Sequence, residues 1–196
     1  MLDKDYFSHE TAVIDEDVSI GNGTKIWHFS HIMSKSKIGS NCNIGQNVVV
    51  SPDVILGDNC KVQNNVSIYS GVTCDSDVFL GPSMVFTNVI NPRSAVNRRG
   101  HYSKTHVGQG SSIGANSTIV CGNDVGPYAF IGAGAVITKY VKPYSLVVGN
   151  PAKHIGWMSR FGQRLKFDRD GFAQCSEGLD WYKLKDEEVQ YLGKNK

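Results

Sequence analysis

The sequence predicts an all-β solenoid assembled from hexapeptide repeats, and three observations lead to this fold class. Large apolar residues recur at every sixth position, glycine and asparagine recur in the turns between them, and one segment of about twenty residues interrupts the series. A six-residue period fits neither a helix nor a half-buried flat sheet, and a fixed repeat is typical of solenoids. With 196 residues the chain can form one substantial core, most of it built from the repeat.

The apolar positions form two series. The first runs without a break through Ile14, Ile20, Ile26, Ile32, Ile38, Ile44, Val50, Leu56, Val62, Ile68, Cys74, Leu80 and Phe86. The second is displaced by three positions and consists of Val107, Ile113, Ile119, Val125, Ile131 and Ile137.

Each hexad is interpreted as a short strand followed by a turn. The apolar residue is often followed by glycine, the next two positions favour Asn, Gly, Asp and Ser, and the fifth is small or β-branched, as in residues 38–43 and 113–118. Asn and Gly tolerate the left-handed backbone of a tight corner. Because so short a strand cannot bury its face alone, successive hexads must stack into a prism.

The interruption, at about residues 87–106, predicts a loop that protrudes from the prism immediately after Asn88, the last regular corner residue. No Asp or Glu occurs between Asp77 and Asp124. The loop carries the cations Arg93, Arg98, Arg99 and Lys104. Such an electropositive patch suits phosphates, and a long loop in a compact repeat is more often functional than a merely solvated connection.

After Pro151 the six-residue period stops, and strand-like runs alternate with turn signals from Arg164 to Leu192. This pattern predicts a small C-terminal antiparallel β meander, which we expect to cover the open end of the prism. Ile155, Trp157 and Phe161 would pack against the last coil or a neighbouring subunit. The chain therefore divides into two expected domains, a β-helix over residues 1–153 and a β-rich appendage over residues 154–196.

Composition excludes several function classes. A formal charge of +2 argues against a general nucleic-acid binder, and no run of about eighteen apolar residues predicts membrane insertion. The segment 1–10 lacks the basic and apolar regions of a secretory signal. The five cysteines form no CxxC pair, so neither a zinc knuckle nor a redox motif is expected. We therefore expect a cytoplasmic protein.

Four segments, together with the repeat, carry a family resemblance: residues 25–32 (KIWHFSHI), 62–69 (VQNNVSIY), 81–93 (GPSMVFTNVINPR) and 148–153 (VGNPAK). They resemble the hexapeptide-repeat N-acetyltransferases that act on nucleotide-linked 3-amino sugars, over roughly residues 10–153. The resemblance implies a left-handed parallel β-helix with three hexads per coil, so nineteen hexads give about six coils. It also implies a homotrimer with sites at the subunit interfaces.

The same resemblance implies acetyl-CoA as co-substrate, no metal, and a nucleotide-linked amino sugar as acceptor. The acceptor that fits best is UDP-2-acetamido-3-amino-2,3-dideoxy-glucuronate, used in surface-polysaccharide or O-antigen synthesis. A dTDP-3-amino-3,6-dideoxyhexose is the near alternative.

Residues around the loop are candidates for binding the acceptor. An arginine fork matches both a pyrophosphate and a uronate carboxylate, so Arg93, Arg98 and Arg99 are expected to bind either group. Gln63, Asn65 and Tyr69 would bind sugar hydroxyls, or else form an outward polar ladder. Phe86, in the Phe-Thr-Asn motif at the loop entrance, is also expected to contact the substrate.

Catalysis of acetyl transfer to an amine requires donors for the tetrahedral oxyanion and an acceptor for the proton of the ammonium. The amide of Asn88 can position the amine or donate to the oxyanion, but it cannot act as a base. The departing CoA thiolate can collect the proton, since a free thiol has a pKa of about 8.5. His28 and His31 are the alternative bases, with His106 a weaker candidate.

For acetyl-CoA, the resemblance implies a groove between subunits beside the last coils. Small residues would leave the backbone accessible to the pantetheine arm there, and polar residues nearby would meet the phosphates or the adenine. The matching positions are Gly114, Ala115, Gly132, Ala133, Lys139, Asn150 and Lys153.

Three other interpretations remain open. The γ-class carbonic anhydrases share the fold, but their zinc needs three histidines, and His101 and His106 have no clear third partner here. Acetyl transfer to a small amine is a second possibility. The third is a non-catalytic hexapeptide subunit of a larger assembly, for which no acetyl-CoA binding is expected.

Overall fold

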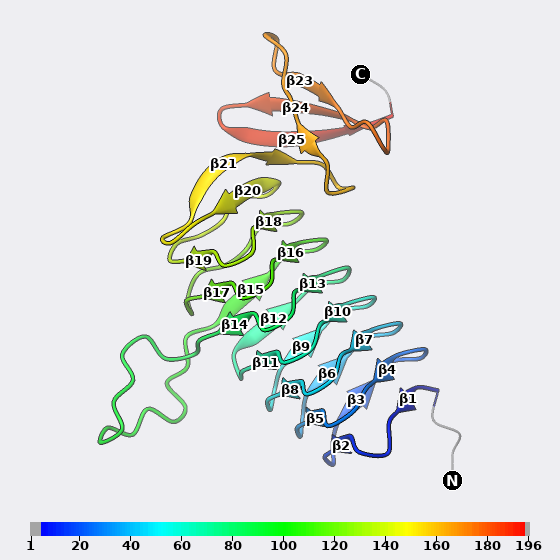
Figure 1. Ribbon diagram of the computed structural model, residues 1–196, viewed down its shortest axis with the longest axis vertical. Coiled ribbons are helices and arrows are strands. Elements are labelled where there is room, and N and C mark those ends of the chain that lie inside the picture. Colours follow the sequence, from blue (N-terminus) through cyan, green and yellow to red (C-terminus); the bar gives the residue numbers. More distant parts are fainter. Residues whose placement is uncertain (1–4, 195–196) are drawn as a thin grey trace.

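The computed structural model describes residues 5–194, which form a three-faced prism of stacked coils with a small sheet at its C-terminal end (Figure 1). Residues 1–4 and 195–196, the outermost parts of the two expected domains, lie outside the described residues. Within residues 5–194 there is no helix long and apolar enough to cross a membrane.

The chain visits three sheets in turn, numbered here in the order in which it first reaches them. Sheet 1 contains β1 (Phe7–Ser8), β4 (Lys25–Ile26), β7 (Asn43–Ile44), β10 (Lys61–Val62), β13 (Phe79–Leu80), β16 (Ser112–Ile113), β18 (Phe130–Ile131), β20 (Ser145–Val148), β21 (Lys153–Met158) and β22 (Arg164–Leu165). Sheet 2 contains β2 (Val13–Ile14), β5 (His31–Ile32), β8 (Val49–Val50), β11 (Ser67–Ile68), β14 (Val85–Phe86), β17 (Thr118–Ile119) and β19 (Val136–Ile137). Sheet 3 contains β3 (Ser19–Ile20), β6 (Lys37–Ile38), β9 (Ile55–Leu56), β12 (Val72–Cys74) and β15 (Thr105–Val107).

Stacking of the coils explains why the apolar series has a period of six. Three hexads make one coil of eighteen residues, so Ile26 pairs with Ile44 and Ile32 with Val50 in parallel register. All four side chains are 0% exposed and belong to one continuous core along the prism axis. The predicted all-β fold, a parallel β-helix of hexapeptide repeats, is confirmed.

Three corners join the sheets, and backbone hydrogen bonds between coils stack each corner on the next. Corner 1, between sheets 1 and 2, contains His28, Gln46, Asn64, Pro82, Ala115 and Ala133. Corner 2, between sheets 2 and 3, contains Ser34, Pro52, Ser70 and Asn88. Corner 3, between sheets 3 and 1, contains Ser40, Asp58, Ser76, Gln109 and Pro127.

The break in the apolar series is an insertion at corner 2. Val107 pairs with Cys74, and the two residues are 33 positions apart where a regular coil would separate them by 18. Fifteen residues are therefore inserted, which is two and a half hexads, and the half hexad produces the displacement by three. The inserted segment forms the predicted loop, which stands clear of the prism (Figure 1).

The prism contains more coils than the six expected, because the stack continues at both ends. Sheet 1 has eight parallel rungs, from β1 to β20, because β1 and β20 extend the stack beyond the apolar series. The last coil is also two residues short, since Val125 pairs with Val141 and Ile131 with Val147, each sixteen positions on. The estimate of six coils was therefore too low.

The C-terminal segment closes the end of the prism as an antiparallel extension. Strand β21 folds back against β20, β22 pairs with β21, and a three-stranded meander follows. The meander consists of β23 (Phe172–Gln174), β24 (Trp181–Lys185) and β25 (Glu188–Gly193). Its core includes Tyr182, which is 0% exposed and packs edge-on at 5.9 Å against Tyr144 of corner 3. The predicted meander is confirmed, whereas the domain division at residue 153 stays a prediction.

Of the three apolar residues expected to pack here, Trp157 joins the meander core, and Ile155 is 43% exposed. Phe161 is 48% exposed, but its ring lies against Gly178, where a side chain would collide with it.

Candidate active site

The two ends of the loop meet at Asn88. The carbonyl of Asn88 accepts a hydrogen bond from the Ser103 amide at 3.0 Å, and the Thr105 amide donates to the Gly71 carbonyl at 3.0 Å. Tyr69 lies one coil below this junction and is 40% exposed. Asn88 therefore lies at the loop base, one coil above the level of Tyr69.

The loop leaves the prism between β14 and β15 and runs toward the N-terminal end, with its tip near the level of β2 and β5 in the view of Figure 1. None of its four cations forms an ion pair with another described residue. Arg93 and Arg99 are exposed, and Arg98 has a buried Nε without a hydrogen-bond partner among these residues. The loop therefore presents uncompensated positive charge beside sheet 2.

The loop also carries apolar side chains that its own prism does not cover. Ile90 is 69% exposed, and Val96 and Tyr102 are exposed as well. Exposed apolar side chains on a protruding segment are typical of protein–protein contacts, so we expect a second protein surface to cover them.

His31 forms an ion-pair geometry with Asp15 on the outer surface of sheet 2. Its Nε2 lies 2.9 Å from Asp15 Oδ1, while Asp15 Oδ2 accepts from the Ser34 amide at 3.2 Å. The hydrogen bond to His31 is the main cause that lowers the pKa of the Asp15 carboxyl, with the Ser34 amide acting in the same direction. Such a pair fixes the orientation of the imidazole and leaves Nδ1 without a partner among the described residues.

His28 lies in an aromatic cluster at the N-terminal end of corner 1. Its ring stacks on His9 at 3.5 Å between centroids, and Trp27 donates through Nε1 to Asn43 at 2.9 Å. Phe29 is 61% exposed and has a φ of 57° at a corner position where asparagine is usual. The left-handed backbone is costly for a bulky side chain, and such strained residues are often found at functional sites.

A shallow cavity of about 290 Å³ adjoins this aromatic cluster. It is lined by Trp27, His28, Asn43, Gly45, Gln46, Gln63 and Asn64. The structure thus brings His28 and Gln63 together at corner 1. Asn65 is close by in the same corner, but its side-chain oxygen already accepts a hydrogen bond from Asn47 at 2.9 Å.

The histidines and Asn88 do not form one cluster within a chain. In sheet 2, β5 with His31 is separated from β14, which precedes Asn88, by β8 and β11. Three rungs at 4.7–4.9 Å each correspond to about 14 Å along the prism. A single amine held at Asn88 is therefore beyond the direct reach of His31 of the same chain.

Six of the seven residues expected to bind acetyl-CoA lie together at the upper part of corner 1. Gly114 and Gly132 leave no room for a side chain, since a Cβ on Gly114 would lie 2.5 Å from the Ala133 amide. Ala115 and Ala133 stack through the hydrogen bond from the Gly134 amide to the Ala115 carbonyl at 2.8 Å. Above them, Lys153 pairs with Val148, which contacts Gly132, and Asn150 follows in the adjoining turn. Lys139 is separated from this group because it follows β19 at corner 2.

One expectation needs correction. Phe86 is 1% exposed and belongs to the core, because it occupies the inward position of its hexad, so its ring cannot contact a substrate outside the prism. His101 and His106, the histidines weighed for the alternative zinc site, lie apart: His101 bonds to the Arg99 carbonyl, and His106 lies between Thr73 and Asp75 at 3.1 and 3.2 Å. Residues 5–194 contain no group of three potential metal ligands.

Sequence reasoning missed Asp15 and His9 as partners of the two histidines. Asp15 precedes His31 by sixteen positions and His9 precedes His28 by nineteen, so neither falls on the eighteen-residue column used to predict neighbours. In both pairs the side chain contacts a residue of the next coil that lies beside its own column, so these contacts could have been found by also considering residues one or two positions away from the eighteen-residue spacing.

Comparisons with known proteins identify relatives with the same repeat. The bacterial transferase hexapeptide family (six repeats) matches residues 17–52, and the family described as hexapeptide repeat of succinyl-transferase matches residues 36–70 and 104–139. A dTDP-3-amino-3,6-dideoxy-alpha-D-galactopyranose 3-N-acetyltransferase of Aneurinibacillus thermoaerophilus is 42% identical over 187 residues, covering 95% of both chains.

Solved structures with a similar fold are more distant in sequence. A mutant of GDP-perosamine N-acetyl transferase from Caulobacter crescentus, in complex with CoA and GDP-perosamine, is 19% identical with a TM-score of 0.52. The acetyltransferase domain of PglB from Neisseria gonorrhoeae is 23% identical with a TM-score of 0.51. Each match covers 76% of this chain and 57% of the other, and at these identities the likeness concerns the fold alone.

Proposed function

Because this chain belongs to the hexapeptide-repeat sugar N-acetyltransferases, we propose that it transfers the acetyl group of acetyl-CoA to the 3-amino group of a nucleotide-linked amino sugar. Membership rests on the relative from Aneurinibacillus thermoaerophilus, which matches 95% of the chain at 42% identity. The acceptor and the residues that carry the reaction are our proposal.

The observation that carries the proposal is the order of three features along the prism. The loop with its arginines reaches toward the N-terminal coils, Asn88 lies at the loop base, and the row of small residues at corner 1, where we place the acetyl-CoA groove, begins one coil above. A nucleotide sugar bound below Asn88 and acetyl-CoA bound above it would therefore meet at Asn88. Phosphates of the sugar nucleotide would lie beside Arg93, Arg98 and Arg99, which lack carboxylate partners among the described residues.

The chemistry at this meeting point needs few side chains. The sugar amine attacks the thioester carbonyl, a bond forms between nitrogen and carbon, and a tetrahedral oxyanion develops. The Asn88 amide donates to this oxyanion or orients the amine. Collapse breaks the carbon–sulfur bond, and the CoA thiolate takes the proton that the new amide nitrogen loses.

We propose a homotrimer, since Asn88 and the acetyl-CoA groove lie on different corners of one prism. Asn88 is at corner 2, whereas Gly114 and Ala133 are at corner 1. Three prisms around an axis parallel to their own would bring corner 2 of one chain beside corner 1 of the next at the same height. The exposed Ile90, Val96 and Tyr102 of the loop would then be covered by the neighbouring subunit.

For the acceptor, the closely matching relative supports a dTDP-3-amino-3,6-dideoxyhexose as the first substrate to test. The UDP-linked 3-amino uronate stays a second candidate, because three loop arginines exceed what a pyrophosphate needs and could also bind a sugar carboxylate. The unpaired state of all five cysteines fits the reducing cytoplasm proposed from the sequence.

The deciding experiment measures thiol release from acetyl-CoA with a panel of dTDP- and UDP-linked 3-amino and 4-amino sugars. We expect turnover with a 3-amino sugar and product masses increased by one acetyl group. If no member of the panel is acetylated faster than acetyl-CoA hydrolyses, the proposed function is wrong.

A further inference from the structure

Corner 1 departs from its own repeat in the N-terminal coils. Between β4 and β18, the residue that follows each sheet 1 strand is Trp27 or Gln63 in two coils and glycine in the other four, at Gly45, Gly81, Gly114 and Gly132. The position two residues further on has a positive φ from residue 29 to residue 134, and it is Phe29 in one coil but Asn, Ser or Gly in all the others. Because the coils fold with small or polar residues at both positions, the repeat itself does not require Trp27, Phe29 or Gln63.

A gap remains between two of these large side chains. Trp27 and Gln63 are two rungs apart, about 9.5 Å along the prism, and Gly45 on the rung between them has no side chain. Stacked aromatic rings have centroids about 4.5–7 Å apart, so the gap has room for one flat ring. It belongs to the cavity of about 290 Å³ at this corner, which we call the corner 1 slot.

The floor of the corner 1 slot is aromatic and fixed in orientation. Trp27 donates through Nε1 to Asn43 at 2.9 Å, and the planes of the Trp27 and His28 rings lie within 6° of each other. His9 stacks on His28 at 3.5 Å. Even so, Trp27 is 36% exposed and Phe29 is 61% exposed, so these rings do not form a closed apolar core. Flat rings that are held in place but still accessible are typical platforms for stacking a nucleobase.

The slot also supplies hydrogen-bonding groups. The side-chain amides of Gln46 and Gln63 line it, and neither has a hydrogen-bond partner among residues 5–194. An amide carries a donor and an acceptor side by side, which complement the N3–H group and the adjacent carbonyl of thymine or uracil. None of the seven lining residues is Asp, Glu, Lys or Arg, so a neutral ring suits the slot and phosphates would lie outside it.

The slot lies on the side of Asn88 toward which the loop runs. Gly45 follows β7, so it is two rungs, or about 9.5 Å, below the level of Asn88 after β14. The loop and its arginines extend past this level toward β5 (Figure 1). A nucleotide sugar with its amine at Asn88 and its phosphates along the loop would therefore bring its base to the height of the slot.

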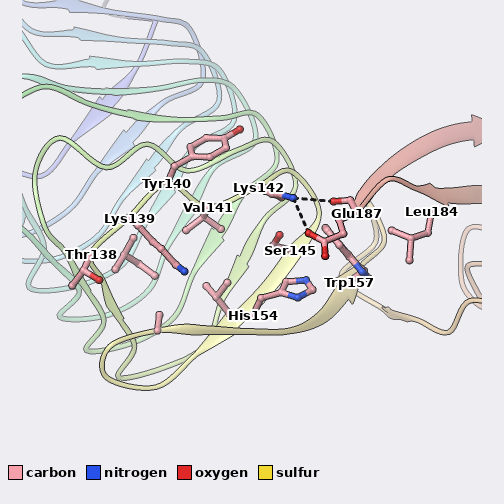
Figure 2. Close-up of a pocket in the computed structure, with 13 residues that line it drawn as sticks. Thr138, Lys139, Tyr140, Val141, Lys142, Ser145, His154, Trp157, Leu184 and Glu187 are labelled. Atoms are coloured by element: carbon pink, nitrogen blue, oxygen red, sulfur yellow. Dashed lines mark hydrogen bonds and ion pairs between the residues drawn. The ribbon is translucent and has the colours of Figure 1, made fainter.

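A second cavity does not meet this condition. It has a volume of about 620 Å³ and lies between the last coil and the C-terminal strands, with Lys139 and Lys142 on its rim (Figure 2). This cavity is above the level of Asn88, and in the proposed trimer it adjoins the acetyl-CoA groove of the neighbouring chain. A base that extends from Asn88 toward the N-terminal coils cannot reach it.

Resting on the proposed function, we propose that the corner 1 slot binds the pyrimidine base of the nucleotide-linked acceptor. The base stacks on Trp27, and Gln63 pairs with its edge instead of with a sugar hydroxyl. In the proposed trimer this slot belongs to the subunit next to the one whose Asn88 and loop arginines hold the sugar and the phosphates. Recognition of the base and positioning of the amine are then tasks of different chains.

The test is calorimetric titration of the full chain with dTDP, UDP and GDP, and with inorganic pyrophosphate, which lacks a base. We expect dTDP or UDP to bind more tightly than GDP and at least tenfold more tightly than pyrophosphate. Trp27→Leu and Gln63→Ala should each weaken binding of the preferred nucleotide about tenfold. Both variants should bind pyrophosphate as the wild type does, which also shows that they are folded. Gln109→Ala, which removes an exposed amide at corner 3, is the control and should change neither affinity.

Three results would overturn the proposal: equal affinity for pyrophosphate and the nucleotides, preference for GDP, or unchanged nucleotide affinity in both slot variants. The titration needs neither acetyl-CoA nor turnover, so its outcome is distinguishable from that of the acetylation panel. A chain that binds dTDP through the slot but acetylates no sugar would contradict only the proposed function. A chain that acetylates an amino sugar 1-phosphate as efficiently as the nucleotide-linked sugar would contradict only the slot.

Discussion

At the scale of single residues, Asn88 is the side chain on which the proposed chemistry depends most. It ends the last regular corner before the loop, and it lies where the two substrates would meet. We expect Asn88→Ala to lower kcat about 10²-fold, because removal of one oxyanion donor typically costs this much. Steady-state kinetics with the best acceptor of the panel measures the effect.

Asn123→Ala is the matched control for this substitution. Asn123 lies in the coil above, and its side chain donates to the Val120 carbonyl at 2.7 Å, so its loss affects only the local turn. If both variants keep wild-type kcat, Asn88 has no part in the reaction.

His31 tests whether a histidine base operates. The proposed proton acceptor is the CoA thiolate, and His31 lies about 14 Å along the prism from the level of Asn88. We therefore expect His31→Gln to change kcat less than about threefold, while the KM of the nucleotide sugar rises if the nucleotide reaches the N-terminal coils. A large fall in kcat, accompanied by loss of one ionisation from the pH–rate profile, would instead identify His31 as the base.

At the scale of elements, the loop is expected to act as a phosphate clamp. Replacing Arg93, Arg98 and Arg99 together by Gln should raise the KM of the nucleotide sugar at least tenfold, or about 1.4 kcal/mol. The KM of acetyl-CoA should stay the same. The wild-type KM should also rise with salt more steeply than that of the variant, because screening weakens only charged contacts.

Arg169→Gln, which removes an exposed charge from the C-terminal segment, controls for net charge. An equal effect of this control would mean that the loop arginines steer the substrate only through the overall field of the protein.

The groove at corner 1 can be tested by a pair of glycines with the same local geometry. A Cβ on Gly114 would lie 2.5 Å from the Ala133 amide, and one on Gly57 at corner 3 would lie 2.5 Å from the Ser76 amide. Each Gly→Ala substitution should push two rungs apart and cost about 1–3 kcal/mol of stability. Only Gly114→Ala should raise the KM of acetyl-CoA; a similar rise in Gly57→Ala would remove the groove assignment.

Much of the fold could be predicted because the large apolar residue at every sixth position is the one that faces the core. The thirteen-step series, the loop after Asn88 and the displacement by three all correspond to observed features. The ends could not be predicted in this way. There β1 and β20 pair with one regular coil only, and the last coil is shortened by two residues, so their sequences no longer follow the period.

The candidate site was predictable to the extent that it follows the columns. Column spacing located Asn88 as the last regular corner residue. The family resemblance supplied Gly114, Ala115, Gly132 and Ala133, and the Phe-Thr-Asn motif supplied Phe86, whose inward position excludes it. Pairs such as Asp15 with His31 depend on the direction of side chains across a rung, and the cavity between the last coil and the C-terminal strands depends on tertiary packing. Neither is encoded in a one-dimensional spacing.

At the scale of the whole molecule, packing of the prism should protect the cysteine thiols from reagents in solution. All five cysteines are buried, and burial raises the pKa of the Cys74 thiol to about 12. The Cys74 thiolate that would react with a disulfide reagent is therefore almost absent at pH 8, and burial keeps the reagent away from the other four thiols. We expect no reaction of the native protein with Ellman's reagent and five thiols per chain after denaturation; rapid reaction of the native protein would show that the coils open readily.

The assembly makes the strictest prediction, because a site shared between corners 2 and 1 of different chains can be rebuilt from two inactive variants. Asn88→Ala removes the corner 2 contribution, and Ala133→Glu blocks the corner 1 groove with a charged side chain. In a mixed trimer, an interface is intact where the first variant supplies corner 1 and the second supplies corner 2, which happens at about one interface in three.

Co-expression of the two variants with different tags, followed by tandem purification that removes the pure trimers, should therefore restore about a third of wild-type activity. The wild-type mass should be about 64 kDa for three chains of 21.4 kDa. A mixed trimer as inactive as its parents would place both contributions in one chain, and a monomeric mass would remove the shared site altogether. Because the exposed apolar loop residues and the two half-sites all depend on the neighbouring prism, activity and assembly should be lost together on dilution.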